Sequence, residues 1–260
     1  MSEKVVTYEL DGEIALIGLN RPDKRNSLSP ELQAQLRDAA LRAGEEAKCG
    51  ILFGYGENFC AGLDLAWAAE NWQEGKNQKL PFRYNRNGYQ EIIARGNIPF
   101  IAALHGATLG GGLETASAAH IRVADETTFF GLPEGTRGIY IGGGGSVRIA
   151  RLLGFSRMQD MMLTGRVLKP DEAERMGLVQ YLVPKGQSLA KAKELALRIC
   201  KNAPLSNFAI TNSLPRLQDM GYDDGLYFER MVGEYTRSPE SITRLKQFLD
   251  KTAPRLRMPD

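Results

Sequence analysis

The chain has 260 residues, of which 43% are hydrophobic and 25% are charged. This is the ordinary balance of a globular protein with one to two domains, so composition excludes a disulfide-stapled miniprotein and a disordered chain. Lysine and arginine total 33 against 31 aspartate and glutamate, which leaves a net charge of +2. Because the two totals are nearly equal, they exclude a general electrostatic surface for nucleic acid. A local basic pocket remains compatible with them.

The three cysteines, Cys49, Cys60 and Cys200, are an odd number without CxxC spacing. The sequence therefore predicts reduced thiols rather than a disulfide framework or a zinc ribbon. The N-terminus carries charges where a signal peptide needs an apolar core, and no stretch reaches about 18 consecutive apolar residues. We expect a cytoplasmic protein that does not associate with membranes.

Short apolar runs predict buried strands in the first half of the chain. They lie at residues 5–10, 14–19, 51–53, 99–104, 121–124 and 127–130. Asp11-Gly12, between the first two runs, favours a β-hairpin. Helices are predicted between strands: one begins at Pro30 behind the capping residue Ser29, one lies within residues 80–96, and one covers residues 113–119. This alternation predicts an α/β layered architecture.

The chain changes character after Gly154, where helical patterns predominate. They cover residues 156–163, 170–176, 188–202, 201–219, 223–237 and 239–251, and one further strand is expected at 178–183. The shift near residue 200 is the candidate boundary between a catalytic core at residues 1–200 and a C-terminal helical subdomain at residues 201–260.

Gly110-Gly111-Gly112 stands at the opening of a predicted helix, where unpaired N–H groups and the helix dipole favour a developing negative charge. The plainer alternative is that these glycines only permit close packing of strand and helix. Neither this cluster nor residues 142–146 give a GxGxxG or GK[ST] pattern, so nucleotide-binding loops are not supported. Ser146 is not in a GxSxG elbow, and His105 and His120 are the only histidines, which argues against a serine hydrolase and favours structural histidines.

Two glutamates stand in apolar, glycine-rich surroundings. Glu114 follows the glycine triplet, and Glu134 follows Pro133 just after a predicted strand. Burial and mutual repulsion push the pKa values of two such carboxyl groups apart, so that one can act as an acid while the other acts as a base. The structural alternative is that Glu114 favours its helix N-terminus while Glu134 pairs with Arg137 or Arg148.

Several motifs, in this order and at these intervals, resemble the enoyl-CoA hydratase/isomerase (crotonase) family. They are NRPDKRNSL at 20–28, NFCAGLDL at 58–65, IAALHGATLGGGLETA at 101–116, TFFGLPE at 128–134, and LTGR at 163–166 with AERMGLV at 173–179. The resemblance covers nearly the whole chain. It implies a crotonase-like spiral of strand-strand-helix units, followed by C-terminal helices that pack subunits into a homotrimer or a homohexamer.

The resemblance also implies an acyl-CoA substrate and roles for four residues. The backbone N–H groups of Leu63 and Gly111 would hold the thioester oxygen, which suits backbone donors next to glycine because they can approach closely. Glu114 would deprotonate water for attack at C3, while Glu134 would deliver a proton to C2. No metal is implied, and coenzyme A enters only as part of the substrate.

Both glutamates together favour an enoyl-CoA hydratase, since isomerase relatives often keep only the second. Three alternatives stay open: an enoyl-CoA isomerase, a hydratase-lyase acting on an aryl-propenoyl thioester, and an acyl-CoA-binding protein with little turnover. An intact carboxylate pair argues against the binding protein.

The same resemblance implies contacts to CoA and to the acyl group. Adenine and pantetheine would lie along residues 61–66, which include Ala61, Asp64, Leu65 and Ala66. The phosphates would face Lys24 and Arg25, and a neighbouring subunit's CoA would meet Phe248 and Lys251, although a solvated Lys251 is the alternative. Tyr140 would line the acyl pocket. A large or aromatic acyl group, or else ordinary packing, would explain the aromatic residues Trp67, Trp72, Phe82, Tyr84 and Tyr89.

Overall fold

The computed structural model describes residues 4–72 and 88–252. Its contacts divide the chain into two compact units, Met1–Cys200 and Lys201–Asp260. Among the described residues, no helix combines the length and the apolar character needed to cross a membrane. The predicted aromatic residues Phe82 and Tyr84 lie outside the described part of the chain.

The first unit is built on a six-stranded sheet with the order β1-β2-β3-β4-β6-β9. Its strands are β1 (Val6–Asp11), β2 (Ile14–Leu19), β3 (Cys49–Gly54), β4 (Phe100–Leu104), β6 (Ile121–Asp125) and β9 (Tyr181–Val183). The predicted hairpin is confirmed, since β1 and β2 pair antiparallel around Gly12. All the other neighbours pair parallel, so their connections must cross over the sheet.

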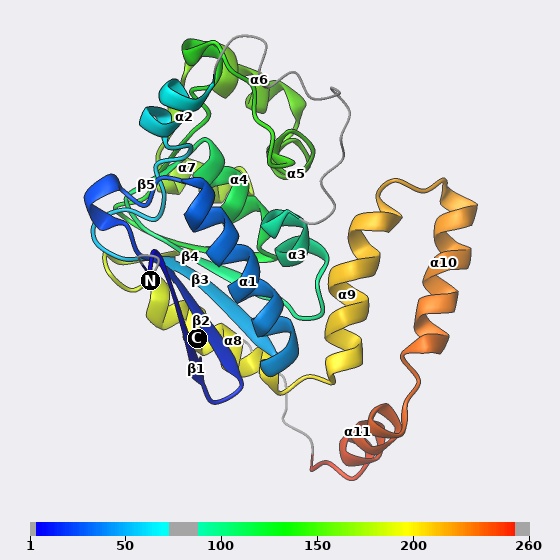
Figure 1. Cartoon of the computed structure of the whole chain (residues 1–260). Helices are drawn as coiled ribbons and strands as arrows, with labels where there is room; N and C mark the ends of the chain where they lie inside the picture. The colour runs from blue at the N-terminus through cyan, green and yellow to red at the C-terminus, as the bar shows by residue number, and fades with distance from the viewer. Residues whose placement is uncertain (1–3, 73–87, 253–260) are drawn as a thin grey trace. The chain divides into compact units, whose positions relative to one another are not determined.

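Helices cover both faces of this sheet. Every residue of β2 is buried, and alternate side chains belong to different cores. Ile17 packs with residues of α1 (Pro30–Glu46), whereas Leu16 packs with residues of α8 (Ser188–Cys200). The two helices accordingly lie on opposite faces of the sheet in Figure 1. Burial on both sides explains why the strands are continuous apolar runs rather than alternating ones.

A second, three-stranded sheet has the order β5-β7-β8. It contains β5 (Ala107–Leu109), β7 (Phe129–Gly131) and β8 (Val167–Leu168). Each of two successive turns of chain contributes one strand to each sheet and then a helix: β4, β5 and α4 (Gly111–Ala118), followed by β6, β7 and α5 (Gly145–Leu153). These are the strand-strand-helix units that the sequence resemblance implied, and the sequence did not predict the short strands β5 and β8.

The remaining helices of the first unit are α2 (Leu65–Asn71), α3 (Tyr89–Arg95), α6 (Phe155–Thr164) and α7 (Pro170–Arg175). The sequence did not predict α2 or α5. Helix α2 has only seven residues, and α5 begins at Gly145, the last of a run of glycines that by itself indicates a loop. Both therefore depend on tertiary contacts more than on local propensity.

The second unit consists of three helices, α9 (Pro204–Leu217), α10 (Tyr222–Tyr235) and α11 (Pro239–Leu249). α9 and α11 fall within the ranges predicted from the sequence, and α10 begins one residue before its predicted range. Proline occupies the first turn of α9 and α11, where its missing N–H costs nothing. No residue of α10 or α11 is buried, and both helices expose large apolar side chains.

Candidate active site

Leu63, in the segment before α2, and Gly111, at the start of α4, line the same pocket. Gly111 is the first residue of α4, and a side-chain carbon placed on it would lie 3.7 Å from the backbone nitrogen of Leu63. Leu63 is held in place by residue Leu28, whose N–H donates to Gly62 O and whose carbonyl accepts from Asp64 N. Within the described part of the chain, neither Leu63 N–H nor Gly111 N–H has a hydrogen-bond partner. Two unsatisfied backbone donors that line one pocket can stabilise an oxyanion.

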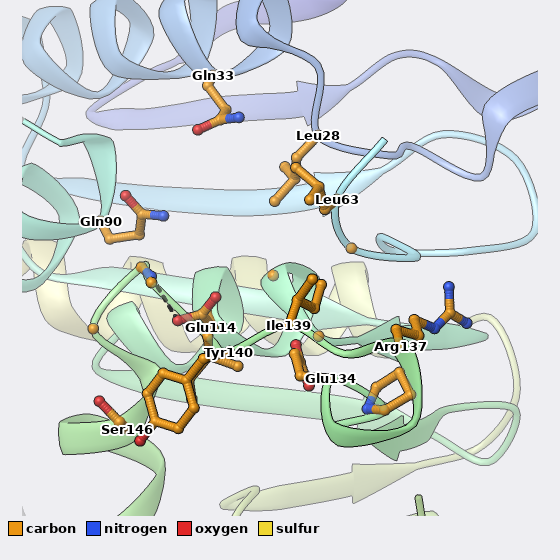
Figure 2. Close-up of a pocket in the computed structure, with 18 of the residues that line it drawn as sticks. Leu28, Gln33, Leu63, Gln90, Glu114, Glu134, Arg137, Ile139, Tyr140 and Ser146 are labelled. Carbon is orange, nitrogen blue, oxygen red and sulfur yellow. Dashed lines mark hydrogen bonds between the residues drawn. The ribbon is translucent and has the colours of Figure 1, made fainter. Parts of the chain in front are cut away.

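Glu114 lies on the first turn of α4 and is only 5% exposed. Its Oε1 accepts hydrogen bonds from Gly143 N at 2.7 Å and Gly145 N at 3.0 Å. In Figure 2 a dashed line ends on the Glu114 carboxylate. The carboxylate is thus oriented by backbone donors some thirty residues downstream, rather than by its own helix N-terminus. One oxygen is fixed, and Oε2 takes no part in these two bonds.

Glu134 follows Pro133 and is also 5% exposed. Its buried Oε2 has no hydrogen-bond partner among the residues that the structure describes. Burial is the main cause that raises the pKa of Glu134 above its ordinary value, and the negative charge of Glu114 acts in the same direction. A carboxyl group in this environment is suited to hold and deliver a proton.

The structural alternative for Glu134 is wrong in one part, because Arg148 pairs with Glu91 instead. The charge of Arg137 lowers the pKa of Glu134, but this is the last of the causes that act on it, after burial and the charge of Glu114. Gly110 explains why Glu134 can approach α4 so closely. It has a φ of +51°, and a side-chain carbon there would lie 2.8 Å from Glu134 Oε1. Only glycine fits this backbone and this space.

These groups share a pocket of about 560 Å³, drawn in Figure 2, which is a size typical of small-molecule sites. The predicted site residues that line it are Ala61, Leu63, Leu65, Gly111, Glu114, Glu134 and Tyr140. The structure therefore brings together the four residues expected to perform the chemistry. Trp72 also lines the pocket, whereas Tyr89 is buried and its hydroxyl pairs with Thr115 Oγ1 at 2.9 Å. Tyr89 is thus an ordinary core residue.

Other predicted residues do not line this pocket. Lys24 and Arg25 are exposed on the turn that precedes Leu28, and the carbonyl of Arg25 accepts from Ala61 N. Ala66 is exposed on α2, and the carboxylate of Asp64 is engaged in capping that helix. Phe248 and Lys251 belong to the second unit, where both are exposed.

The pocket also contains residues that the sequence did not single out. Gln33 comes from α1 and Gln90 from α3, and Figure 2 shows both side chains directed toward the space across from Glu114. A side-chain carbon on Gly143 would lie 2.6 Å from Gln90 Nε2 and 3.2 Å from Glu114 Oε1. The sequence does not distinguish a glutamine that lines a pocket from the many glutamines on exposed helix faces, so neither residue could be predicted.

The histidines and cysteines have structural surroundings. His120 Nδ1 accepts from Phe100 N, and burial lowers the pKa of His120 to about 4, so its ring is neutral at physiological pH. His105 Nε2 contacts Gly56 O. The three cysteines are buried free thiols, as predicted. No group of three or more metal-binding side chains occurs in the described ranges 4–72 and 88–252.

Comparisons with known proteins agree on one family. The family model described as enoyl-CoA hydratase/isomerase matches residues 9–257. An enoyl-CoA hydratase of Mycobacterium tuberculosis is 34% identical, over 95% of this chain and 94% of that protein. A solved chain from Rhodopseudomonas palustris is 40% identical, with a TM-score of 0.84 and 95% of each chain covered. The enoyl-CoA hydratase structure from Bacillus anthracis is 30% identical, with a TM-score of 0.86, covering 96% of this chain and 98% of its own.

Proposed function

Because this chain belongs to the enoyl-CoA hydratase/isomerase family, we propose that it is an enoyl-CoA hydratase that adds water across the 2,3 double bond of a 2-enoyl-CoA thioester. The observation that carries the proposal is the meeting of two unsatisfied N–H groups, Leu63 and Gly111, with two buried carboxyl groups of different environment. A relative from Clostridium acetobutylicum, a short-chain-enoyl-CoA hydratase, is 32% identical over 95% of both chains.

In the first step, water attacks C3 of the enoyl group. Glu114, fixed through Oε1 by Gly143 and Gly145, uses its carboxylate to orient the water and accept its proton. The electron pair of the double bond moves toward the thioester, and the carbonyl oxygen gains negative charge. The N–H groups of Leu63 and Gly111 stabilise that charge by hydrogen bonds that strengthen as it develops.

In the second step, C2 takes a proton from Glu134, and the enolate collapses to a 3-hydroxyacyl-CoA. The raised pKa of Glu134 supports this role, because an acid must hold its proton until the enolate forms. Proton exchange with solvent then returns Glu114 and Glu134 to their starting states. The proposed steps use two carboxyl groups, two backbone amides and one water.

The first alternative, an isomerase, needs one group that moves a proton between C2 and C4. It gives no reason for two backbone donors to orient a second carboxylate beside the first, as Gly143 and Gly145 orient Glu114. The second alternative, a hydratase-lyase on aryl-propenoyl thioesters, shares the first steps and would need a wide acyl pocket. Trp72 and Tyr140 line the pocket and are the aromatic side chains that an aryl group could contact.

The experiment follows absorbance of the conjugated thioester with crotonyl-CoA and cinnamoyl-CoA, and identifies products by mass. Hydration predicts loss of absorbance with a gain of one water. A product of unchanged mass would establish isomerisation, and an aryl aldehyde with acetyl-CoA would establish the lyase. Binding of both thioesters without any product would establish an acyl-CoA-binding protein.

We also propose that CoA lies along Ala61 to Ala66, with its phosphates near Lys24 and Arg25. These two cations precede Leu28 on the turn whose backbone bonds to residues 61–64, which places them close to the oxyanion segment. Replacement of both by alanine should raise KM for crotonyl-CoA and leave KM for crotonyl-pantetheine, which lacks the nucleotide phosphates, unchanged. Equal effects on both thioesters would contradict the assignment.

We also propose that the chain assembles as a homotrimer or homohexamer, which the exposed apolar side chains of α10 and α11 support. Tyr222, Tyr227, Leu245, Phe248 and Leu249 are all more than 60% exposed, and apolar patches of this kind mark interfaces between proteins. In such an assembly Phe248 and Lys251 would meet a neighbouring subunit's CoA. Light scattering after size-exclusion chromatography measures the mass, and a monomer would contradict this proposal.

A further inference from the structure

Arg148 joins three parts of the first unit that surround the pocket. It lies on α5, and its side chain is 16% exposed. Its Nη1 donates to Glu91 Oε1 on α3 at 2.8 Å, and its Nη2 donates to the carbonyl oxygen of Gly143. Its Nε is buried and has no partner among the residues that the structure describes. A guanidinium with this little solvent contact is held by the groups around it.

Gly143 forms two hydrogen bonds through its backbone. Its carbonyl accepts from Arg148, while its N–H donates to Glu114 Oε1. Gly144, with a φ of +83°, lies directly against the guanidinium, because a side-chain carbon placed on it would be 2.7 Å from Arg148 Nη1. Gly145 then supplies the second donor to Glu114. The backbone of residues 143–145 is therefore bonded both to the Arg148 guanidinium and to the Glu114 carboxylate.

Four consecutive glycines at positions 142–145 cannot hold one conformation by themselves, since each loses more backbone freedom on ordering than any other residue type. The donors that orient Glu114 thus need an anchor outside the loop. Arg148 provides this anchor, because its planar guanidinium carries several hydrogen-bond donors in fixed geometry. Glu91 orients the guanidinium by accepting a hydrogen bond from Nη1.

We propose that Arg148, oriented by Glu91, is a positioning residue that fixes the glycine backbone and thereby the direction in which Glu114 presents its carboxylate to water. The inference rests on the proposed hydratase reaction and adds the group on which its first step depends. Neither residue is bonded to Glu134, Leu63 or Gly111 in the described structure, so proton transfer at C2 does not depend on Arg148.

Two assays on one protein separate these steps. Hydration of crotonyl-CoA requires Glu114. Exchange of a C2 hydrogen of butyryl-CoA with D₂O requires only Glu134 and the two N–H groups: ionised Glu134 removes the proton, the enolate oxygen is held, and a deuteron returns to C2. The saturated chain has no double bond for water to attack. The ratio of hydration to exchange therefore reports the orientation of Glu114.

The variants are Arg148→Met, Arg148→Lys and Glu91→Gln, with Arg175→Met as the control. Arg175 forms an exposed ion pair with Asp171 on α7 and is not among the residues that line the pocket. In Arg148→Met we expect kcat for hydration to fall about 10- to 100-fold, the range usual for loss of a group that orients a reacting residue. KM and the exchange rate should change by less than about threefold, because the substrate contacts remain.

Arg148→Lys should recover part of the loss, because an ammonium group can reach the Gly143 carbonyl but cannot form the planar fork. Glu91→Gln should lower the ratio less than Arg148→Met does. A folded Arg148→Met protein with wild-type kcat, or parallel loss of hydration and exchange, would overturn the proposal. If Arg148→Met does not fold, unchanged ratios in the other two variants overturn it. A wild-type protein that exchanges but never hydrates would instead refute the proposed function.

Discussion

Asp64 and Arg21 form an ion pair, 3.0 Å between Oδ2 and Nη1, at the residue that directly follows Leu63, the proposed oxyanion donor. The other carboxylate oxygen of Asp64 accepts from Trp67 N at 3.2 Å and caps α2. Burial by itself would raise the pKa of Asp64, but the Trp67 N–H and Arg21 outweigh it and hold that pKa below its ordinary value. The carboxylate therefore anchors the segment that carries the Leu63 N–H.

Replacing Asp64 by alanine should affect both stability and turnover. Loss of the helix cap should cost about 1 kcal/mol of unfolding free energy, and kcat should fall because Leu63 N–H loses its fixed direction. Denaturant unfolding and steady-state kinetics with crotonyl-CoA measure the two effects.

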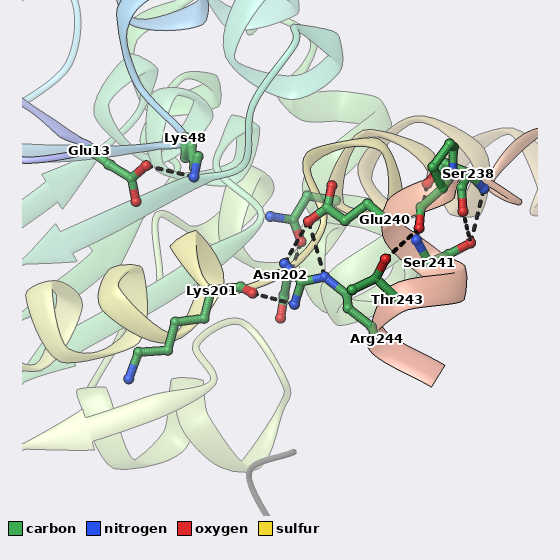
Figure 3. A network of polar contacts seen from close by, with 11 residues as sticks. Glu13, Lys48, Lys201, Asn202, Ser238, Glu240, Ser241, Thr243 and Arg244 are labelled. Carbon is green, nitrogen blue, oxygen red and sulfur yellow. Dashed lines mark hydrogen bonds and ion pairs between the residues drawn. The ribbon is translucent and has the colours of Figure 1, made fainter. Parts of the chain in front are cut away.

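The control for this substitution is Ser238→Ala. Ser238 caps α11 through its side chain, with Ser241 N as donor, and Figure 3 shows this capping pair. It should lower stability by a similar amount and leave kcat at saturating substrate unchanged. If Asp64→Ala lost only as much activity as Ser238→Ala, the carboxylate would be a structural cap and nothing more.

Glu114→Gln and Glu134→Gln should each reduce kcat for hydration at least about 100-fold, because each removes a positioned proton-transfer group. The two variants should differ in the exchange assay. Glu134→Gln should abolish deuterium incorporation at C2 of butyryl-CoA, whereas Glu114→Gln should retain it. Retained hydration in Glu114→Gln would contradict its role with water, and wild-type turnover in both would refute the two-glutamate mechanism.

The raised pKa of Glu134 predicts a pH dependence of activity. The acid must be protonated when it meets the enolate, so kcat for hydration should fall as pH rises through the raised pKa of Glu134. A pH profile of kcat measures this limb. It should disappear from the residual activity of Glu134→Gln, and a limb that persists there would belong to another group.

The same raised pKa predicts an effect on stability. A carboxyl whose pKa is higher in the folded than in the unfolded state contributes stability that is fully present below the unfolded pKa, near 4.5, and is lost as pH rises through the folded value. Glu134→Gln removes this loss. Its thermal midpoint should exceed that of the wild type at neutral pH, and the difference should shrink toward acidic pH. A midpoint below wild type at neutral pH would show that ionised Glu134 is stabilised by its surroundings.

Gly110→Ala tests the contact between α4 and Glu134. The added carbon would lie 2.8 Å from Glu134 Oε1 and would occupy a backbone with a φ of +51°, so it should displace the carboxyl group. We expect kcat to fall at least about tenfold, in line with the sensitivity of proton transfer to geometry.

Gly12→Ala is the matched substitution, because Gly12 has a φ of +61° and nothing within 4 Å of the added carbon. It should cost stability through backbone strain and leave kcat unchanged. Comparable kinetics in the two variants would show that strain, rather than displacement of Glu134, accounts for any loss.

The sequence by itself determined the α/β alternation, most strand positions and the motif order that identified the family. Local signals were sufficient there: Asp11-Gly12 specifies a tight turn, and Pro30 behind Ser29 specifies a helix start. The sequence did not predict the helices α2 and α5, because α2 has only seven residues and α5 begins in a glycine run. For both, packing supplies what local propensity does not.

The sequence also indicated that Glu114 and Glu134 carry proton transfer, because both carboxyl groups stand in apolar, glycine-rich surroundings. Only the tertiary structure decided how each is held. Glu114 is oriented by Gly143 and Gly145, and Arg148 meets Glu91 across 57 positions of chain. Such pairings arise when crossover connections bring distant segments onto the same side of a sheet. These pairings cannot be predicted from the spacing of residues in the sequence, because the free energy that stabilises them comes from contacts that exist only in the folded protein.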